Sequence, residues 1–149
     1  MVKVLVKKLD PAVKLPEYKT DGASGMDIIA FLKKTINIKS KTSSLIPTGI
    51  SIAFSESYEI QIRPRSGLAA KNNITVLNSP GTIDSDYRGE IKVVIYNHGD
   101  SDFIVNNGDR IAQMVLSPVV KIKLEETNDL PKTIRGEGGF GSTGKWIQS

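Results

Sequence analysis

The sequence contains no cysteine and only one histidine, His98. Disulfide bonds and thiolate chemistry are therefore absent, and a zinc site built from Cys and His side chains has too few ligands. These two scarcities exclude zinc catalysis and leave little room for Cys–His or Ser–His catalysis.

Long apolar runs are also missing. Apolar residues make up 39% of the chain and occur in short groups, none of which is long enough to cross a bilayer. The N-terminus shows no basic segment followed by an apolar one, as a secretory leader would. We therefore expect a cytoplasmic protein with no membrane partner.

Length and charge limit the remaining possibilities. A chain of 149 residues fits one domain and can bury a real core without disulfides or metal. The net charge of +4 favours anionic ligands, but the lysines are spread along the chain and form no block. A nucleotide fits this pattern better than a nucleic-acid duplex, so no nucleic-acid partner is expected.

The hydrophobic pattern predicts an all-β fold. Period-two alternation in short segments between turn residues is typical of a β-sandwich or jelly roll. Such segments are Val2 to Val6, Ile36 to Lys39, Ile50 to Phe54, Tyr58 to Arg63, Glu90 to Tyr96, Phe103 to Val105, Arg110 to Leu116 and Val119 to Leu124. One short helix is expected over Ser66 to Asn72, with Ser66 as N-cap and Asn72-Asn73 as its stop. We expect a single domain over residues 1–149, with residues 131–149 as a mobile C-terminal arm.

The first candidate site is Pro64-Arg65-Ser66-Gly67, where a predicted strand ends and the helix begins. Helix N-terminal N–H groups attract anions, a guanidinium can bind two phosphate oxygens, and glycine permits close approach. The alternative is an ordinary capped helix with a surface arginine.

The second candidate is the glycine-bounded loop of residues 81–90. Asp84, Asp86 and Glu90 offer a divalent-ion site or a general base, and Tyr87 offers an aromatic face. The loop lacks the ligand spacing of an EF-hand, so calcium fits poorly. Upstream, Asn78 can donate and accept hydrogen bonds at once, as reading the imide edge of uracil requires. The alternatives are a polar hairpin turn and a turn-forming asparagine.

Two further elements are weaker. Asp27 places a carboxylate shortly after Gly25, and Arg110 and Gln113 lie in an otherwise apolar strand. Strict alternation would put Gln113 on one face with Ile111 and Val115, which favours a partly polar site at that face.

The C-terminal segment Arg135-Gly136-Glu137-Gly138-Gly139-Phe140-Gly141-Ser142-Thr143-Gly144 is half glycine and cannot hold a helix or strand. An arginine, exposed N–H groups, small hydroxyls and one phenyl ring suit a polyphosphate that carries a flat base. The alternative is a flexible, solubilising terminus.

In order, these elements resemble the five motifs of the trimeric deoxyuridine triphosphate nucleotidohydrolase (dUTPase) family, and the resemblance covers nearly the whole chain. The matching segments are Ser24-Gly25-Met26-Asp27, Pro64-Arg65-Ser66-Gly67-Leu68, Gly81-Thr82-Ile83-Asp84-Ser85-Asp86-Tyr87-Arg88-Gly89, Gly108-Asp109-Arg110-Ile111-Ala112-Gln113 and Arg135 to Gly144. The departures are Ser24, where alanine is common, and Ser142-Thr143, where other members vary.

The resemblance implies a homotrimer of jelly-roll-like subunits with three active sites, each at a subunit interface. It implies hydrolysis of dUTP to dUMP and pyrophosphate with Mg²⁺, which clears dUTP from the nucleotide pool and supplies dUMP for thymidylate synthesis. Asp84 resembles the general base that activates water, and Tyr87 resembles the residue that packs on deoxyribose. Asn78 and the backbone near Lys92 would read uracil.

The same resemblance distributes the remaining site residues. The loop of Gly81, Thr82, Ile83 and Asp84 would line the sugar and base pocket. The triphosphate would be held by Arg65, Ser66, Gly67 and Gln113, and then by Arg135, Gly141, Ser142 and Thr143 when the arm closes. Phe140 would stack on uracil. Asp27 resembles a supporting residue that orients the second motif or a water of the magnesium shell.

Two alternatives remain. A deoxycytidine triphosphate deaminase shares the fold and the phosphate-binding logic, although the intact 84–87 loop and the glycine-rich arm disfavour it. A non-catalytic β-domain that binds nucleotides or a partner is disfavoured by the retention of Asp84, Arg65, Gln113, Arg135 and Phe140.

Overall fold

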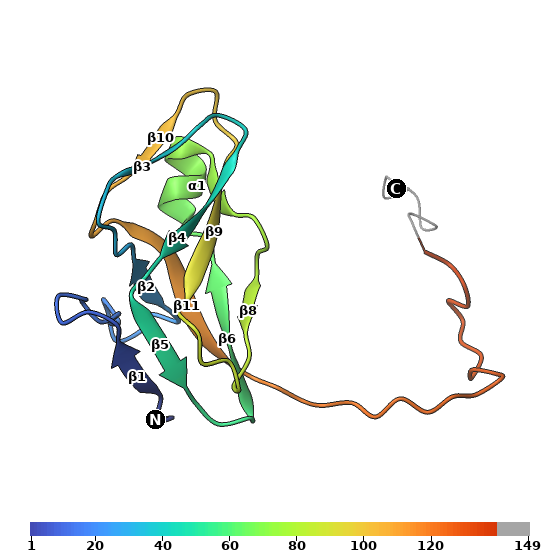
Figure 1. Ribbon diagram of the computed structural model, residues 1–149. Helices are drawn as coiled ribbons and strands as arrows, with labels where there is room; N and C mark the ends of the chain where they lie inside the picture. The colour runs from blue at the N-terminus through green and yellow to red at the C-terminus, as the bar shows by residue number, and fades with distance from the viewer. Residues whose placement is uncertain (140–149) are drawn as a thin grey trace.

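The chain folds into short β-strands and one short helix, as described by a computed structural model for residues 1–139 (Figure 1). In chain order the elements are β1 (Leu5–Lys8), β2 (Met26–Ile29), β3 (Ile36–Ile38), β4 (Ser43–Pro47), β5 (Ile50–Ala53), β6 (Tyr58–Arg63), α1 (Ser66–Asn72), β7 (Ile74–Val76), β8 (Gly81–Ile83), β9 (Lys92–Asn97), β10 (Phe103–Val105) and β11 (Arg110–Pro118). The expected all-β fold with one helix is confirmed. In the described part of the chain, no helix is long and apolar enough to span a membrane.

The largest sheet has the strand order β2-β11-β6-β8, with every neighbouring pair antiparallel. One face carries Ile60, Ile62 and Ala112 into the core. Side chains alternate along a strand, so the neighbours of these residues point to the opposite face. Several of those neighbours are polar, including Gln61 and Arg63 of β6. Gln113 lies on that polar face, where its Cα is paired with Asp27 on one side and Arg63 on the other.

A second sheet has the order β4-β9-β7, and two-stranded ribbons β1-β5 and β10-β3 complete the β-structure (Figure 1). Its central strand β9 is buried at Val93, Ile95 and Asn97 and exposed at Lys92. The core between the sheets consists almost entirely of isoleucine and valine. Such β-branched side chains pack well on a pleated surface, so these buried residues favour strands over helices.

The helix differs from the expectation at its start. Arg65, not Ser66, is the N-cap, and no side chain caps the first turn. Ser66 is therefore the first helical residue, with its hydroxyl uncommitted to capping. The predicted stop is confirmed, because Asn73 adopts a left-handed conformation (φ 57°) and its N–H bonds to carbonyls of the last turn.

Most predicted strands are present with slightly different bounds, whereas the predicted strand Val119 to Leu124 is wrong. β11 ends at Pro118, and the chain then leaves the body as an extended segment without helix or strand through residue 139 (Figure 1). Alternation alone does not make a strand, because a strand needs a pairing partner and no other described segment pairs with this one. The strands β2, β4, β7 and β8 were not predicted from the sequence.

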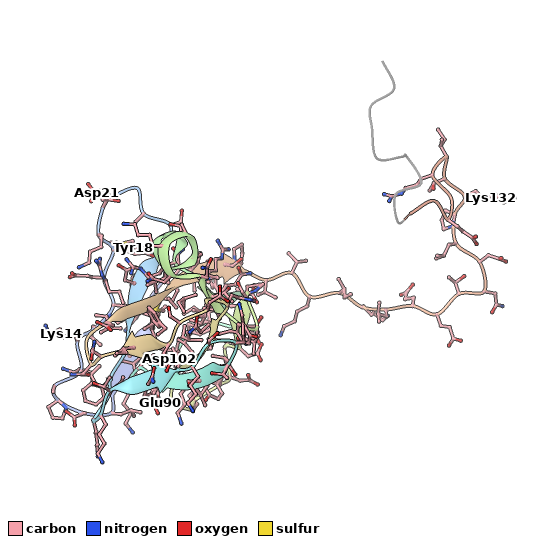
Figure 2. All side chains as sticks on the ribbon, turned by 90° about the horizontal axis from the view of Figure 1, so that it is seen from above. Lys14, Tyr18, Asp21, Glu90, Asp102 and Lys132 are labelled. Carbon is pink, nitrogen blue, oxygen red and sulfur yellow. The ribbon has the colours of Figure 1, made fainter. Side chains whose placement is uncertain are left out.

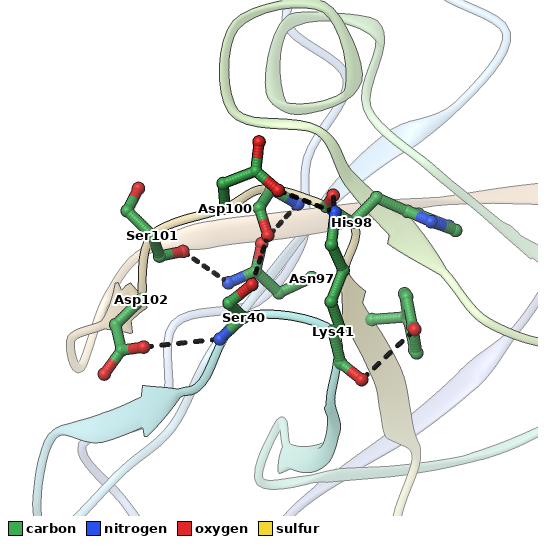
Figure 3. Close-up of polar contacts among 9 residues, drawn as sticks. Ser40, Lys41, Asn97, His98, Asp100, Ser101 and Asp102 are labelled. Carbon is green, nitrogen blue, oxygen red and sulfur yellow. Dashed lines mark hydrogen bonds and ion pairs between the residues drawn. The ribbon is translucent and has the colours of Figure 1, made fainter.

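A buried asparagine ties the end of β9 to the end of β3 and to the turn after β9, and Figure 3 shows its contact with Ser101 in that turn. Asn97 is 1% exposed, and its amide nitrogen donates to the carbonyl oxygens of Ile38 at 3.0 Å and Ser101 at 2.9 Å. Its Oδ1 accepts from the Gly99 N–H at 2.9 Å. One side chain therefore satisfies three backbone groups in a tight corner.

We expect Asn97→Ala to lower the free energy of unfolding by about 3 kcal/mol, because it leaves three backbone groups without their partner. Urea unfolding followed by circular dichroism at a fixed protein concentration measures this change. The control is Asn37→Ala, which removes only an exposed bond to Asp102 and should cost less than about 1 kcal/mol. Equal effects of the two substitutions would contradict the role assigned to Asn97.

Candidate active site

Six of the predicted substrate residues line one cavity of about 390 Å³ beside β8 and β9. Its wall consists of Asn78, Thr82, Ile83, Asp84, Tyr87 and Lys92, together with Leu45 and Glu90. Gly81 lies directly under Asn78, since a Cβ at this glycine would be 3.4 Å from the asparagine Nδ2. The structure thus brings together the residues expected to bind uracil and deoxyribose.

The three carboxylates of this region have different surroundings. Both oxygens of Glu90 are engaged, since Oε1 accepts from the Gly49 N–H at 2.9 Å and Oε2 lies 3.7 Å from the Lys92 Nζ. Asp86 is exposed and lies outside the cavity wall. Asp84 lines the cavity, and no cation pairs with it among the residues the structure describes. Of the three, Asp84 is therefore the one placed to accept a proton from a molecule in the cavity.

Tyr87 folds back over the loop that carries Asp84. Its hydroxyl donates to the Glu90 carbonyl oxygen at 3.0 Å, and its backbone N–H donates to the Asp84 carbonyl oxygen at 3.1 Å. This arrangement requires glycine at position 89, because a Cβ there would be 2.3 Å from the Tyr87 hydroxyl oxygen. The aromatic ring is thereby fixed at the cavity wall.

A second cluster forms on the polar face of the largest sheet, where Asp27 lies between two arginines. Arg65 Nε donates to Asp27 Oδ1 at 3.0 Å, and Arg110 Nη1 donates to Asp27 Oδ2 at 3.1 Å. Arg65 Nη1 also donates to the Arg110 carbonyl oxygen at 3.0 Å. The structure therefore brings the first, second and fourth predicted motifs together through charge.

Gln113 belongs to the same cluster. Its amide Nε2 donates to the Pro64 carbonyl oxygen at 3.0 Å, which ties β11 to the segment just before the helix. Gly25 passes close by, since a Cβ there would be 3.1 Å from Gln113 Oε1. Ser66 and Gly67 are exposed at the start of α1, directly after Arg65.

The expectation that Ile111 shares a face with Gln113 is wrong. The β2–β11 pairing shifts register between Arg110 and Ala112, and both Ile111 and Ala112 are buried in the core. A β-bulge of this kind interrupts strict alternation.

The cavity and the arginine cluster lie toward opposite ends of β6. Ile83 is paired with Ile60, so Asp84 continues past the Glu59 end of β6, whereas Arg65 follows its Arg63 end. The level of Asp84, beside Glu59, and the position of Arg65 are therefore six residues apart along the extended chain. This corresponds to roughly 20 Å at 3.3 Å per residue. The structure of one chain therefore does not bring Asp84 and Arg65 into one site.

Arg135 is not brought to either cluster. It lies on the segment that projects from the body, and its Nε donates to the Gly138 carbonyl oxygen of its own turn at 2.8 Å. Figure 2 shows this segment from above, with Lys132 far from Glu90 and Asp102. The remaining predicted arm residues, Phe140, Gly141, Ser142 and Thr143, lie outside the described residues.

Sequence reasoning missed two residues of these clusters. Leu45 comes from β4 and reaches the cavity because β4 pairs with β9, with Leu45 opposite Val94. No local signal marks such a leucine. Arg110 was noted in its strand without a role, and only the register of β11 shows that it faces Asp27.

The described residues contain no group of three or more His, Cys, Asp or Glu side chains arranged to hold a metal ion. Mg²⁺ keeps several waters and commonly binds through substrate phosphates with few protein ligands. The donor set is therefore compatible with a magnesium ion that binds together with a triphosphate.

The fold resembles solved dUTPase structures. A Staphylococcus bacteriophage 80alpha dUTPase with dUPNHPP matches with a TM-score of 0.85 and 24% identity over 95% of this chain and 98% of that chain. A mutant dUTPase from phage phi11 of S. aureus, whose structure concerns coordination of a structural Mg(II) ion, matches with a TM-score of 0.78 and 20% identity over 87% and 99% of the two chains. At these identities the likeness shows the jelly-roll-like fold.

Sequence relatives are much closer. The deoxyuridine 5'-triphosphate nucleotidohydrolase of Rickettsia bellii is 57% identical over 148 residues, covering 99% of both chains. The protein of the same name from Rickettsia conorii is 55% identical over 145 residues, covering 97% of this chain and 98% of its own. The dUTPase family model matches residues 12–144. The chain therefore belongs to the dUTPase family.

Proposed function

We propose that this dUTP diphosphatase hydrolyses dUTP to dUMP and pyrophosphate by in-line attack of water at the α-phosphorus, with Asp84 as the general base and Mg²⁺ as cofactor. The observation that carries the proposal is the position of the Asp84 carboxylate on the wall of the cavity that also holds Asn78 and Tyr87. The reaction clears dUTP from the nucleotide pool and supplies dUMP for thymidylate synthesis.

The cavity supports selection of deoxyuridine. The Asn78 amide has both a donor and an acceptor, which match the imide edge of uracil, and the backbone near Lys92 supplies further partners. Cytosine reverses the donor and acceptor pattern and would leave buried polar groups unpaired. The Tyr87 ring packs on deoxyribose, where it leaves no room for a 2′-hydroxyl.

In the chemical step, Asp84 removes a proton from water as the water oxygen bonds to the α-phosphorus. The bond from the α-phosphorus to the bridging oxygen breaks, and pyrophosphate leaves. Arg65, Gln113 and the exposed N–H groups of Ser66 and Gly67 hold the triphosphate and stabilise its charge. When a triphosphate is bound, Mg²⁺ held by its phosphates would supply further charge neutralisation.

The separation of the two clusters supports an active site between subunits. Asp84 and Arg65 must act on one triphosphate, and a gap of roughly 20 Å along β6 prevents that within one chain. A second copy of the chain can place its arginine cluster beside the cavity of the first. The expected homotrimer provides three such interfaces.

The projecting segment supports assembly as well. Val120, Ile122 and Leu124 alternate along it and are 80–89% exposed. An apolar stripe of this kind is unfavourable in water unless another surface covers it. We infer that it packs on a neighbouring subunit and carries Arg135, Phe140, Gly141, Ser142 and Thr143 to a site to which other subunits contribute.

We expect Asp84→Asn to lower kcat by about a thousandfold, because asparagine keeps the shape of the side chain and cannot accept the proton. Pyrophosphate release from dUTP with Mg²⁺ measures the effect. Asp86→Asn is the matched control and should leave kcat unchanged, since Asp86 lies outside the cavity wall. Unchanged turnover in Asp84→Asn would show that Asp84 is not the base, and ammonia release from dCTP would favour a deaminase instead.

Removal of residues 135–149 should lower kcat/KM by about a hundredfold or more while leaving the fold intact, because the arm positions the triphosphate and does not build the core. The midpoint of thermal unfolding should change by less than about 3 °C. Steady-state kinetics and circular dichroism test both parts. A truncated protein with full turnover would mean that this segment plays no part in catalysis.

Ile122→Asp should reduce trimer formation and turnover together, because it places a charge in the apolar stripe. Sedimentation equilibrium measures the mass of the assembly. Lys123→Asp is the control, since Lys123 alternates to the other side of the segment and its side chain is 86% exposed. A trimer that is equally stable in both variants would contradict docking of this stripe, and a monomeric, active wild type would contradict the interfacial site.

A further inference from the structure

Arg110 is linked to Arg65, the proposed triphosphate-binding arginine, through Asp27 and through its own backbone. Asp27 is bonded to Arg65 through Oδ1 and to Arg110 through Oδ2. The Arg110 carbonyl oxygen accepts a second bond from Arg65, at Nη1. Arg110 therefore fixes Arg65 at two points, once through its own backbone and once through the Asp27 carboxylate.

A local irregularity of β11 makes this placement possible. In a regular strand, residues 110 and 113 would point to opposite faces of the sheet. The register shift between Arg110 and Ala112 adds one residue to β11 relative to β2, so both Arg110 and Gln113 reach the face that carries Asp27. Ile111 and Ala112 both remain in the core.

The net charge of these three side chains decides how well Arg65 can bind a polyanion. Asp27 alone would neutralise Arg65, and a neutral pair is a poor ligand for a polyanion. Arg110 adds a second positive charge on the other carboxylate oxygen, so the three side chains carry a net charge of +1. The side chains of Asp27 and Arg65 are 17% and 26% exposed, so water screens their charges only in part.

The geometry also leaves N–H donors of Arg65 available for phosphate oxygens. A guanidinium has five N–H donors, and Arg65 uses one on Nε and one on Nη1 within the cluster. Three donors remain, including both on Nη2, which is enough for a bidentate contact with phosphate oxygens.

We propose that Arg110 is a positioning residue that offsets the charge of Asp27, so that Arg65 is held in place while keeping its positive charge available to the triphosphate. The inference rests on the proposed function for its substrate. It assigns Arg110 no contact with the reacting atoms.

Arg110→Gln should weaken binding of inorganic tripolyphosphate about tenfold in calorimetric titration of the full-length protein, and raise the KM for dUTP about as much, with a smaller change in kcat. Asp27 then neutralises Arg65 without compensation. The double variant Arg110→Gln with Asp27→Asn should recover most of the lost affinity, because the offending charge is gone. Arg110→Lys should stay within about threefold of wild type, since lysine can still pair with Asp27.

Lys34→Gln removes one exposed positive charge outside both clusters and controls for net charge. Circular dichroism confirms that each variant is folded. Unchanged tripolyphosphate affinity in Arg110→Gln, a double variant no better than the single one, or an Arg110→Lys variant as weak as Arg110→Gln would each overturn the proposal. If the wild-type protein binds tripolyphosphate but does not hydrolyse dUTP, the proposed function is wrong. The role of Arg110 in phosphate binding is then still tested by the tripolyphosphate titrations.

Discussion

The pairing of β11 with both β2 and β6 is the constraint on which the rest of the structure depends. One face of β11 supplies Ala112 to the core, and its other face carries Gln113 between Asp27 and Arg63. A slip of one residue would exchange these faces, burying the amide and exposing the core side chains. Core stability and site geometry are therefore set by the same register, so that a sequence which packs this core also places these polar groups.

The bulge at the start of β11 resolves a conflict between these two demands. The core requires Ile111 and Ala112 in succession, and the polar face requires Arg110 and Gln113, three residues apart. A strand of period two cannot satisfy both. One extra residue relative to β2 satisfies them at the cost of a local break in the hydrogen-bond ladder. Bulges are common beside functional sites for this reason. Here the bulge lets two of four successive residues pack in the core while the other two reach the polar face.

Sequence patterns predicted the parts of this molecule whose information is local. The all-β fold, the helix stop at Asn73 and the polar loop around Asp84 each follow from a few neighbouring residues. The patterns failed where the outcome depends on a distant partner. Val119 to Leu124 alternates like a strand but has no partner within the described chain, and Leu45 reaches the cavity only through its pairing with β9. The ion pairs of Asp27 likewise join residues 38 and 83 positions apart, which no local pattern specifies.

The separation of Asp84, the proposed base, from Arg65, the proposed phosphate ligand, follows from the geometry of the sheet itself. The two sites lie at the levels of opposite ends of β6, so the rise per residue keeps them apart, and no side-chain rotation can close a gap of roughly 20 Å. Folding that one chain differently would break the β6 pairings that hold the core. In the proposed trimer, association of identical copies would avoid this conflict, since the cavity of one copy would meet the arginine cluster of the next without any change in either fold. In the proposed mechanism, such an arrangement makes catalysis conditional on assembly, because each subunit alone would hold two incomplete half-sites.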